Sequence, residues 1–280
     1  MGRFRAELAF TQIAGLPLLV AAFDNGTMQM WKVLPDGPVP ASAPSLYAPR
    51  DAYRFGYSSD IDDQIYAMAV GEIGEDPGVA LCSAQQISVW NLRTGERLGQ
   101  SADHGDGRQI ALGVVDGRAV VACPRYAVEL IDVLTGHELA RLDGPRDQVM
   151  LVSFVHDGPR AWLAASPASG PVYLWQAGGL SMPGHSGLSQ PKVLPGAASV
   201  LHGCRLAGRP TLVTGGADGI VRFWSMDGAP QHEIDVGSEV RSLAAGPNLL
   251  AVSSGGGLVL IQIQDASRDP AGTPQAGGLA

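Results

Sequence analysis

A seven-residue stretch that ends in tryptophan or isoleucine recurs six times and limits the possible folds more than any other feature of the chain. Its copies read NGTMQMW, AQQISVW, RYAVELI, SGPVYLW, DGIVRFW and GGGLVLI. They end at Trp31, Trp90, Ile131, Trp175, Trp224 and Ile261, so that successive end positions lie 59, 41, 44, 49 and 37 residues apart. Recurrence at about 40–45 residues is typical of a repeated unit of four short strands.

Within each copy, apolar residues alternate with mostly polar ones. The residues one and three places before the end position are apolar in all six copies, and this period of two is typical of a strand with two different faces. Four copies carry glycine five places before the end position. Asn25-Gly26 and Asp218-Gly219 are pairs that supply the positive φ angles of a tight hairpin. Each unit is therefore predicted to contain an apolar strand, a tight turn and this second strand.

Six such units follow one another along the chain. They span about 5–48, 64–101, 107–142, 147–195, 197–236 and 238–263. We therefore predict an all-β fold: a β-propeller of four-stranded antiparallel blades with six recognisable repeat units, of which the last is a candidate for an incomplete blade. Residues 1–263 would form the propeller. Residues 264–280, rich in Pro, Gly and Ala, are expected to be a disordered tail.

The repeats resemble those of the WD-repeat β-propeller family over nearly all of residues 5–263. The resemblance implies structural roles for Trp31, Trp90, Trp175 and Trp224, and a network that includes Asp218, Thr214 and Trp224. The chain departs from the family in two respects. No tryptophan is followed by aspartate, and no Gly-His pair directly precedes the unit of Trp224. No binding residue can therefore be carried over, but the family implies a non-enzymatic scaffold or platform for protein binding.

Charge and cysteine content narrow the classes of partner. The formal net charge is −8 and Lys and Arg form no dense cluster, so we expect no nucleic-acid partner. No run of 18 apolar residues is present, so we expect no membrane association. Three scattered cysteines do not suggest a disulfide framework, and Cys82 and Cys123 lie in apolar runs. These features predict a reduced, cytoplasmic protein.

The sequence shows no motif for catalysis, metal binding or a cofactor. Its six histidines fall in different units, and most are expected at turns or strand ends as surface or capping residues. His202 and Cys204 share one strand face, but zinc requires three or four ligands. We therefore predict no metal, no cofactor and no catalytic residues. Two alternatives remain open: an enzyme or small-ligand binder that uses the mouth of the central channel, and a sensor or regulatory module of a larger signalling protein.

An insertion lengthens the first spacing and is the predicted protein-binding site. It covers residues 44–64 and combines aromatic with acidic side chains, which suit an interface. The resemblance to the WD-repeat family implies that the connection between units 1 and 2 emerges on the same face of the disc as residues of the following units. The predicted site comprises Tyr53, Phe55, Tyr57, Asp60, Asp62, Asp63, Arg125, Tyr126, Arg146 and Asp147. Packing of the aromatics over the first blade is the alternative.

The last unit ends early. Its pattern stops at residue 263, after the third predicted strand, and only Met1–Phe4 precede the first strand of the chain. Either these residues pair weakly with the last blade, or that blade has three strands and an open edge. An open edge can pair with a strand of a partner.

Overall fold

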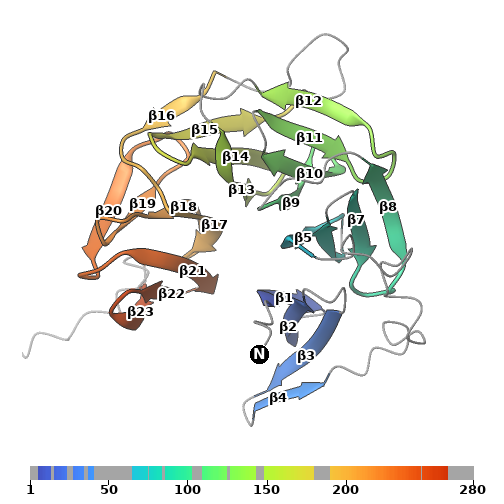
Figure 1. Ribbon diagram of the computed structural model, residues 1–280, viewed down its shortest axis with the longest axis horizontal. Helices are drawn as coiled ribbons and strands as arrows, with labels where there is room; N and C mark the ends of the chain where they lie inside the picture. The colour runs from blue at the N-terminus through green and yellow to red at the C-terminus, as the bar shows by residue number, and fades with distance from the viewer. Residues whose placement is uncertain are drawn as a thin grey trace, which may run out of the picture.

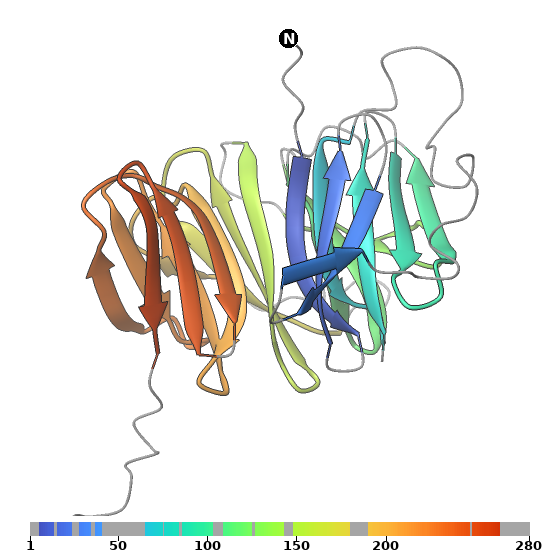
Figure 2. The same ribbon diagram turned by 90° about the horizontal axis from the view of Figure 1, so that it is seen from below.

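The computed structural model contains β-strands and turns, and no helix, in the part of the chain that it describes (Figures 1 and 2). The described residues are 6–13, 16–23, 28–34, 37–40, 65–74, 76–83, 86–102, 109–124, 127–142, 148–179, 190–246 and 248–263. They form six antiparallel sheets, named blades 1 to 6 in chain order.

The strands of each blade lie side by side in chain order. Blade 1 consists of β1 (Ala6–Ile13), β2 (Leu16–Phe23), β3 (Met28–Leu34) and β4 (Gly37–Pro40). Blade 2 consists of β5 (Ala67–Glu72), β6 (Pro77–Cys82), β7 (Gln86–Asn91) and β8 (Arg97–Ala102). Blade 3 consists of β9 (Ala111–Val115), β10 (Arg118–Pro124), β11 (Val128–Asp132) and β12 (Glu138–Leu142).

Blades 4 and 5 repeat this order, whereas blade 6 has three described strands. Blade 4 consists of β13 (Val149–Asp157), β14 (Arg160–Pro167), β15 (Val172–Ala177) and β16 (Lys192–Leu194). Blade 5 consists of β17 (Val200–Leu206), β18 (Arg209–Gly215), β19 (Ile220–Trp224) and β20 (Pro230–Asp235). Blade 6 consists of β21 (Val240–Gly246), β22 (Leu249–Ser254) and β23 (Gly257–Gln262).

The six blades are arranged around a common centre, as in a β-propeller (Figure 1). The first strand of each blade lies innermost, and these strands pack in succession from β1 through β5, β9, β13 and β17 to β21. No comparable packing joins β21 back to β1 among the described strands, and Figure 1 shows the ring open between them. The predicted fold class is confirmed, including an incomplete sixth sheet within the described residues.

Alternation along the third strand gives every blade two apolar faces. The residues one and three places before the end position point toward the following blade, and we call this the forward face. The end position points toward the preceding blade, on the backward face. In blade 4, Val172 and Leu174 pack with Leu212 and Trp224 of blade 5. Because each blade covers its neighbour in this way, the core consists of layers between blades.

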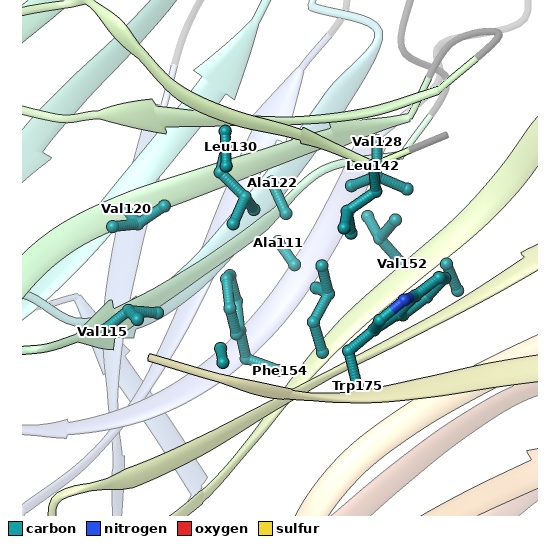
Figure 3. Close-up of a cluster of buried hydrophobic side chains, with 14 of the residues drawn as sticks. Ala111, Val115, Val120, Ala122, Val128, Leu130, Leu142, Val152, Phe154 and Trp175 are labelled. Carbon is teal, nitrogen blue, oxygen red and sulfur yellow. The ribbon is translucent and has the colours of Figure 1, made fainter. Parts of the chain in front are cut away.

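Among the described residues, the buried side chains form five clusters, one for each pair of successive blades. Figure 3 shows the cluster between blades 3 and 4, where Val128 and Leu130 of β11 face Phe154 and Trp175. Leu130 and Leu163 in this cluster are fully buried. Five interfaces are what an open series of six blades provides, whereas a closed ring of six has one more.

Close packing of the inner strands requires glycine at Gly203 on β17. Its backbone amide donates to the Ser153 hydroxyl of β13 at 2.9 Å. A Cβ at this position would lie 1.9 Å from the carbonyl oxygen of Phe154, closer than any non-bonded contact allows. The absence of a side chain therefore lets β17 lie directly against β13.

The turn between the third and fourth strands is built in the same way in blades 2 and 3. Asp132 accepts hydrogen bonds from the amides of Leu134 and Thr135 at 2.9 and 2.8 Å. Asn91 makes the equivalent pair of bonds in blade 2. Gly136 takes the left-handed conformation with φ of 69°. These Asx turns explain why LRTGE and VLTGH recur after the repeated stretch.

Candidate interaction surface

The ten residues of the predicted loop site lie outside the described residues. They are Tyr53, Phe55, Tyr57, Asp60, Asp62, Asp63, Arg125, Tyr126, Arg146 and Asp147. Their role in binding therefore stays a prediction. The tail 264–280 also lies outside the described residues.

The four repeat tryptophans occupy equivalent positions on the third strands of blades 1, 2, 4 and 5. Each pairs across the sheet with an aliphatic residue of the second strand: Leu19, Val79, Leu163 or Leu212. Their burial differs, because Trp175 and Trp224 are each 3% exposed whereas Trp31 and Trp90 are only partly buried. The repeat thus fixes the place of the tryptophan but not the depth of its burial.

Part of the network implied by the WD-repeat resemblance is present in blade 5. The Trp224 indole Nε1 donates to the Thr214 hydroxyl at 3.0 Å, within the core. Asp218 has other contacts: it accepts from the Ile220 amide at 3.1 Å and from the Arg222 guanidinium at 2.7 Å. The hydrogen bond and ion pair with Arg222 help to keep the pKa of Asp218 below its usual value, against the effect of partial burial.

Blade 6 exposes the leucines of its forward face. Leu258 and Leu260 are 69% and 61% exposed, and Leu249 of β22 is 43% exposed. The corresponding residues of blade 4, Val172 and Leu174, are 2% and 1% exposed. The same pattern position is therefore a core position in one blade and a surface position in another.

The forward face of blade 6 carries three rows of uncharged side chains, and the exposed Arg241 lies beside them at the bulge in β21. In the sheet register, Leu260 lies beside Ala251 and Ala244, and Leu258 lies beside Ser253 and Ser242. A third row joins Gln262, Leu249 and Gly246. Side chains this small leave the two leucines exposed, on a face that also carries Ser242, Ser253 and Gln262.

Blade 1 exposes an apolar row on its backward face. Phe10 of β1 is 63% exposed and pairs with Leu19, which in turn pairs with Trp31. Leu19 and Trp31 are partly buried. Trp31 occupies the end position, which in blades 2 to 6 packs against the preceding blade. No described blade precedes blade 1, so this row borders the opening of the ring (Figure 1).

The two exposed faces form the candidate interaction surface, which we call the ring opening. It comprises the forward face of blade 6, with Leu249, Leu258 and Leu260, and the backward face of blade 1, with Phe10, Leu19 and Trp31. Figure 2 views the molecule from this side, with blade 6 in red and blade 1 in blue. In the sequence these residues have the pattern of ordinary core positions of a repeat, so this site was not predicted. The early end of the last unit was the signal that could have revealed it.

The outer edge of blade 6 is a second feature of this region. In blades 1 to 5 the third strand pairs with a fourth, whereas β23 pairs only with β22 among the described residues. Within the described residues this agrees with a three-stranded last blade, one of the two alternatives; Met1–Phe4, which the other alternative would pair there, lie outside the described residues.

A polar cavity of about 440 Å³ lies between blades 1 and 2. It is lined by Thr11, Gln12, Glu72, Gly74, Asp76 and Pro77. Asp76 accepts a hydrogen bond from Asn91 at 3.0 Å and forms an ion pair with Arg93, and both lower the pKa of its carboxyl group. The lining lacks the apolar walls typical of small-molecule pockets.

Two histidines and the cysteines lie within or near the core. His202 lies on β17 together with Cys204, as the sequence indicated, and His156 lies near the end of β13; both histidines are partly buried. Burial lowers the pKa of both imidazoles, and for His156 the charge of Glu72 opposes that shift. Cys82 and Cys123 are buried, and burial raises the pKa of the Cys204 thiol to about 12. The described residues contain no cluster of three or more metal-ligating side chains.

Within the described part of the chain, no helix is long and apolar enough to cross a membrane. No protein-family model matches the chain, and no curated protein matches it either.

Solved structures resemble the fold at low sequence identity. The computationally designed protein Ika8 is 18% identical, with a TM-score of 0.50 over 92% of this chain and 84% of the designed one. A chain in the crystal structure of the mitotic checkpoint complex is 19% identical, with a TM-score of 0.52 over 72% of this chain and 64% of that chain. At such identities the likeness shows the fold alone. Together with the six sheets arranged around one centre, it shows that this chain is a β-propeller.

Proposed function

We propose that this chain is a non-enzymatic platform for protein binding, and that the ring opening is its binding surface. The exposure of Leu258 and Leu260 carries the proposal, because clustered exposed apolar side chains mark interaction sites. Phe10 adds an exposed aromatic ring on the opposite side of the opening, and aromatic side chains are enriched at interfaces.

Two finer assignments belong to the same proposal. We assign the chain to a divergent branch of the WD-repeat family, supported by the repeated end position and by the Trp224–Thr214 hydrogen bond. We also assign it to the cytoplasm, because Cys82, Cys123 and Cys204 remain thiols, as is usual in a reducing compartment. An enzyme or small-ligand binder is the second candidate. The carboxyl groups of Glu72 and Asp76 in the polar cavity between blades 1 and 2 favour it, whereas the lack of apolar walls there does not.

The proposal is tested by comparing the proteins that three forms of the chain retain from a cell extract. The forms are the native chain, a Leu258→Ser/Leu260→Ser variant and a Leu134→Ser/Val193→Ser control. Leu134 and Val193 are 72% and 58% exposed but lie in blades 3 and 4. A partner of the ring opening is retained by the native chain and the control and lost by the blade 6 variant. Equal retention by all three forms would contradict the proposal.

A further inference from the structure

The faces of the ring opening are unfinished copies of an interface that the molecule forms five times. A forward face is covered by the backward face of the next blade. Leu174, for example, is covered by Trp224 of the third strand and Leu212 of the second strand of blade 5. Phe223 of blade 5 is covered in the same way by Leu250 and Val252 of blade 6. Leu258 and Leu260 hold the same positions as Val172 and Leu174 without such a cover. The matching cover in this region is therefore a β-sheet.

Blade 1 presents the complementary half of the same interface. Its end-position residue Trp31, with Leu19 and Phe10, forms the kind of face that covers a forward face elsewhere. A sheet placed in the opening would meet blade 6 with its backward face and blade 1 with its forward face. One occupant then completes both interfaces, and it must be apolar on both sides.

The ring opening does not suit a second copy of the disc. The two apolar faces border the same opening, and each belongs to a blade already packed on its other side (Figure 1). A single sheet can lie between them, whereas an intact disc brings neighbouring blades along with every sheet that it presents. The three rows around Leu258 and Leu260 contain no charged side chain, and Arg241 at the bulge of β21 is the charge beside them. This favours a largely apolar sheet over a highly charged peptide.

We propose that the ring opening accepts one antiparallel β-sheet, apolar on both faces, which a partner protein supplies as an additional blade. This inference rests on the proposed function and names the chemistry of its partner. The sheet would bury Leu258 and Leu260 on one side and Phe10 and Trp31 on the other. Its outermost strand could also pair with the edge of β23.

The test uses a thiol introduced by Leu260→Cys in the full chain. The native cysteines give little background, because Cys82 and Cys123 are each 0% exposed and the pKa of Cys204 is raised to about 12. A maleimide at neutral pH should therefore label position 260 selectively. Leu134→Cys, at a residue that is 72% exposed in blade 3, is the matched control.

The probe is one additional copy of the chain's own repeat, fused to the chain. Residues 225–263 are repeated directly after Ile263, which adds a fourth strand to blade 6 and a further copy of β21–β23. If the opening accepts a sheet, this extension slows labelling at position 260 by about tenfold or more, as expected for a site that reacts only after local opening. Labelling at position 134 remains unchanged.

A partner that occupies the opening must compete with this extra blade. A protein that is retained by the native chain and lost by the extended chain supports the inference. A protein retained equally by both forms binds elsewhere, which overturns this inference and leaves a protein-binding platform intact. Failure of the extension to protect position 260 also overturns it.

Slow labelling of the unextended chain would overturn the inference in another way, because it would mean that the face is already covered. Protection that does not vary with protein concentration would identify a segment of this chain as the cover. Protection that increases with concentration would identify a second copy.

Discussion

The interface between blades 4 and 5 and the opening between blades 6 and 1 are built from the same sequence pattern with opposite results. In the first, Leu174 and Trp224 pack together and are 1% and 3% exposed. In the second, Leu260 is 61% exposed and Trp31 is partly buried. The pattern of a repeat therefore specifies the faces of a blade, and burial depends on whether a neighbour covers them.

This difference also separates stability from binding. A residue at a covered face contributes to folding through the area that it removes from water, about 25 cal/mol per Å². A residue of the same type at the ring opening makes that contribution only when a partner arrives. The four predictions below test this division, from the largest expected effect to the smallest.

The tryptophans of blades 5 and 1 should differ most. Trp224→Ala should lower the free energy of unfolding by about 3–5 kcal/mol, because it leaves a cavity in a closed interface. Trp31→Ala should cost less, about 1–2 kcal/mol, since part of its ring is already in contact with water. Urea unfolding monitored by circular dichroism measures both. Equal losses would mean that blade 1 is covered as completely as blade 5.

The leucines at the forward-face position form a closer pair, because the substitution is the same. Leu174→Ala, at a residue 1% exposed, should cost about 2–5 kcal/mol. Leu260→Ala, at a residue 61% exposed, should change stability by no more than about 0.5 kcal/mol. For the affinity of a partner the order should reverse, and Leu260→Ala should weaken binding more than Leu174→Ala does. A large loss for Leu260→Ala in the isolated chain would contradict an uncovered face.

The closed part of the ring should lose stability in mild acid through its inner-strand histidines. Burial lowers the pKa of His202, so the unfolded chain binds more protons below about pH 6.5, the ordinary value of imidazole. This contribution is complete above that pH and is lost as the pH falls toward the lowered folded value. His202→Asn should flatten the dependence of the melting temperature on pH between pH 7 and pH 5. An unchanged slope in this variant would rule out this origin.

Much of the fold could be predicted from the sequence, because each unit carries its own strands and turns. The end positions Trp175 and Trp224 indicated third strands, and Asp218-Gly219 indicated the preceding hairpin. Both depend on period and local turn chemistry, which a single repeat contains.

The site could not be predicted in the same way. Leu258 and Leu260 satisfy the core pattern as well as Val172 and Leu174 do, so no local signal distinguishes an exposed pair from a buried one. The difference in burial depends on whether a neighbouring blade covers the face, and that is decided by the arrangement of all the blades. The loop with Tyr53 and Tyr57 was predicted as the binding site because its composition is unusual, whereas the leucines of the ring opening match the pattern of core positions.

The smallest expected effect concerns an ion pair that joins two blades in the closed part of the ring. Arg205 of β17 bonds Asp157 of β13 at 2.6 Å, with both side chains about half exposed. Water and salt screen such a pair, so Asp157→Asn should cost only about 0.2–1 kcal/mol. Most of this loss should disappear in 1 M salt, where screening acts over about 3 Å. On blade 6, Arg241 and Glu239 are 4.0 Å apart and more exposed, so Arg241→Gln should have no measurable effect on stability at any salt concentration.

A double-mutant cycle of Arg205 and Asp157 isolates the coupling energy between blades 4 and 5. A coupling energy that is unchanged by salt would show that the contact acts by packing rather than by charge.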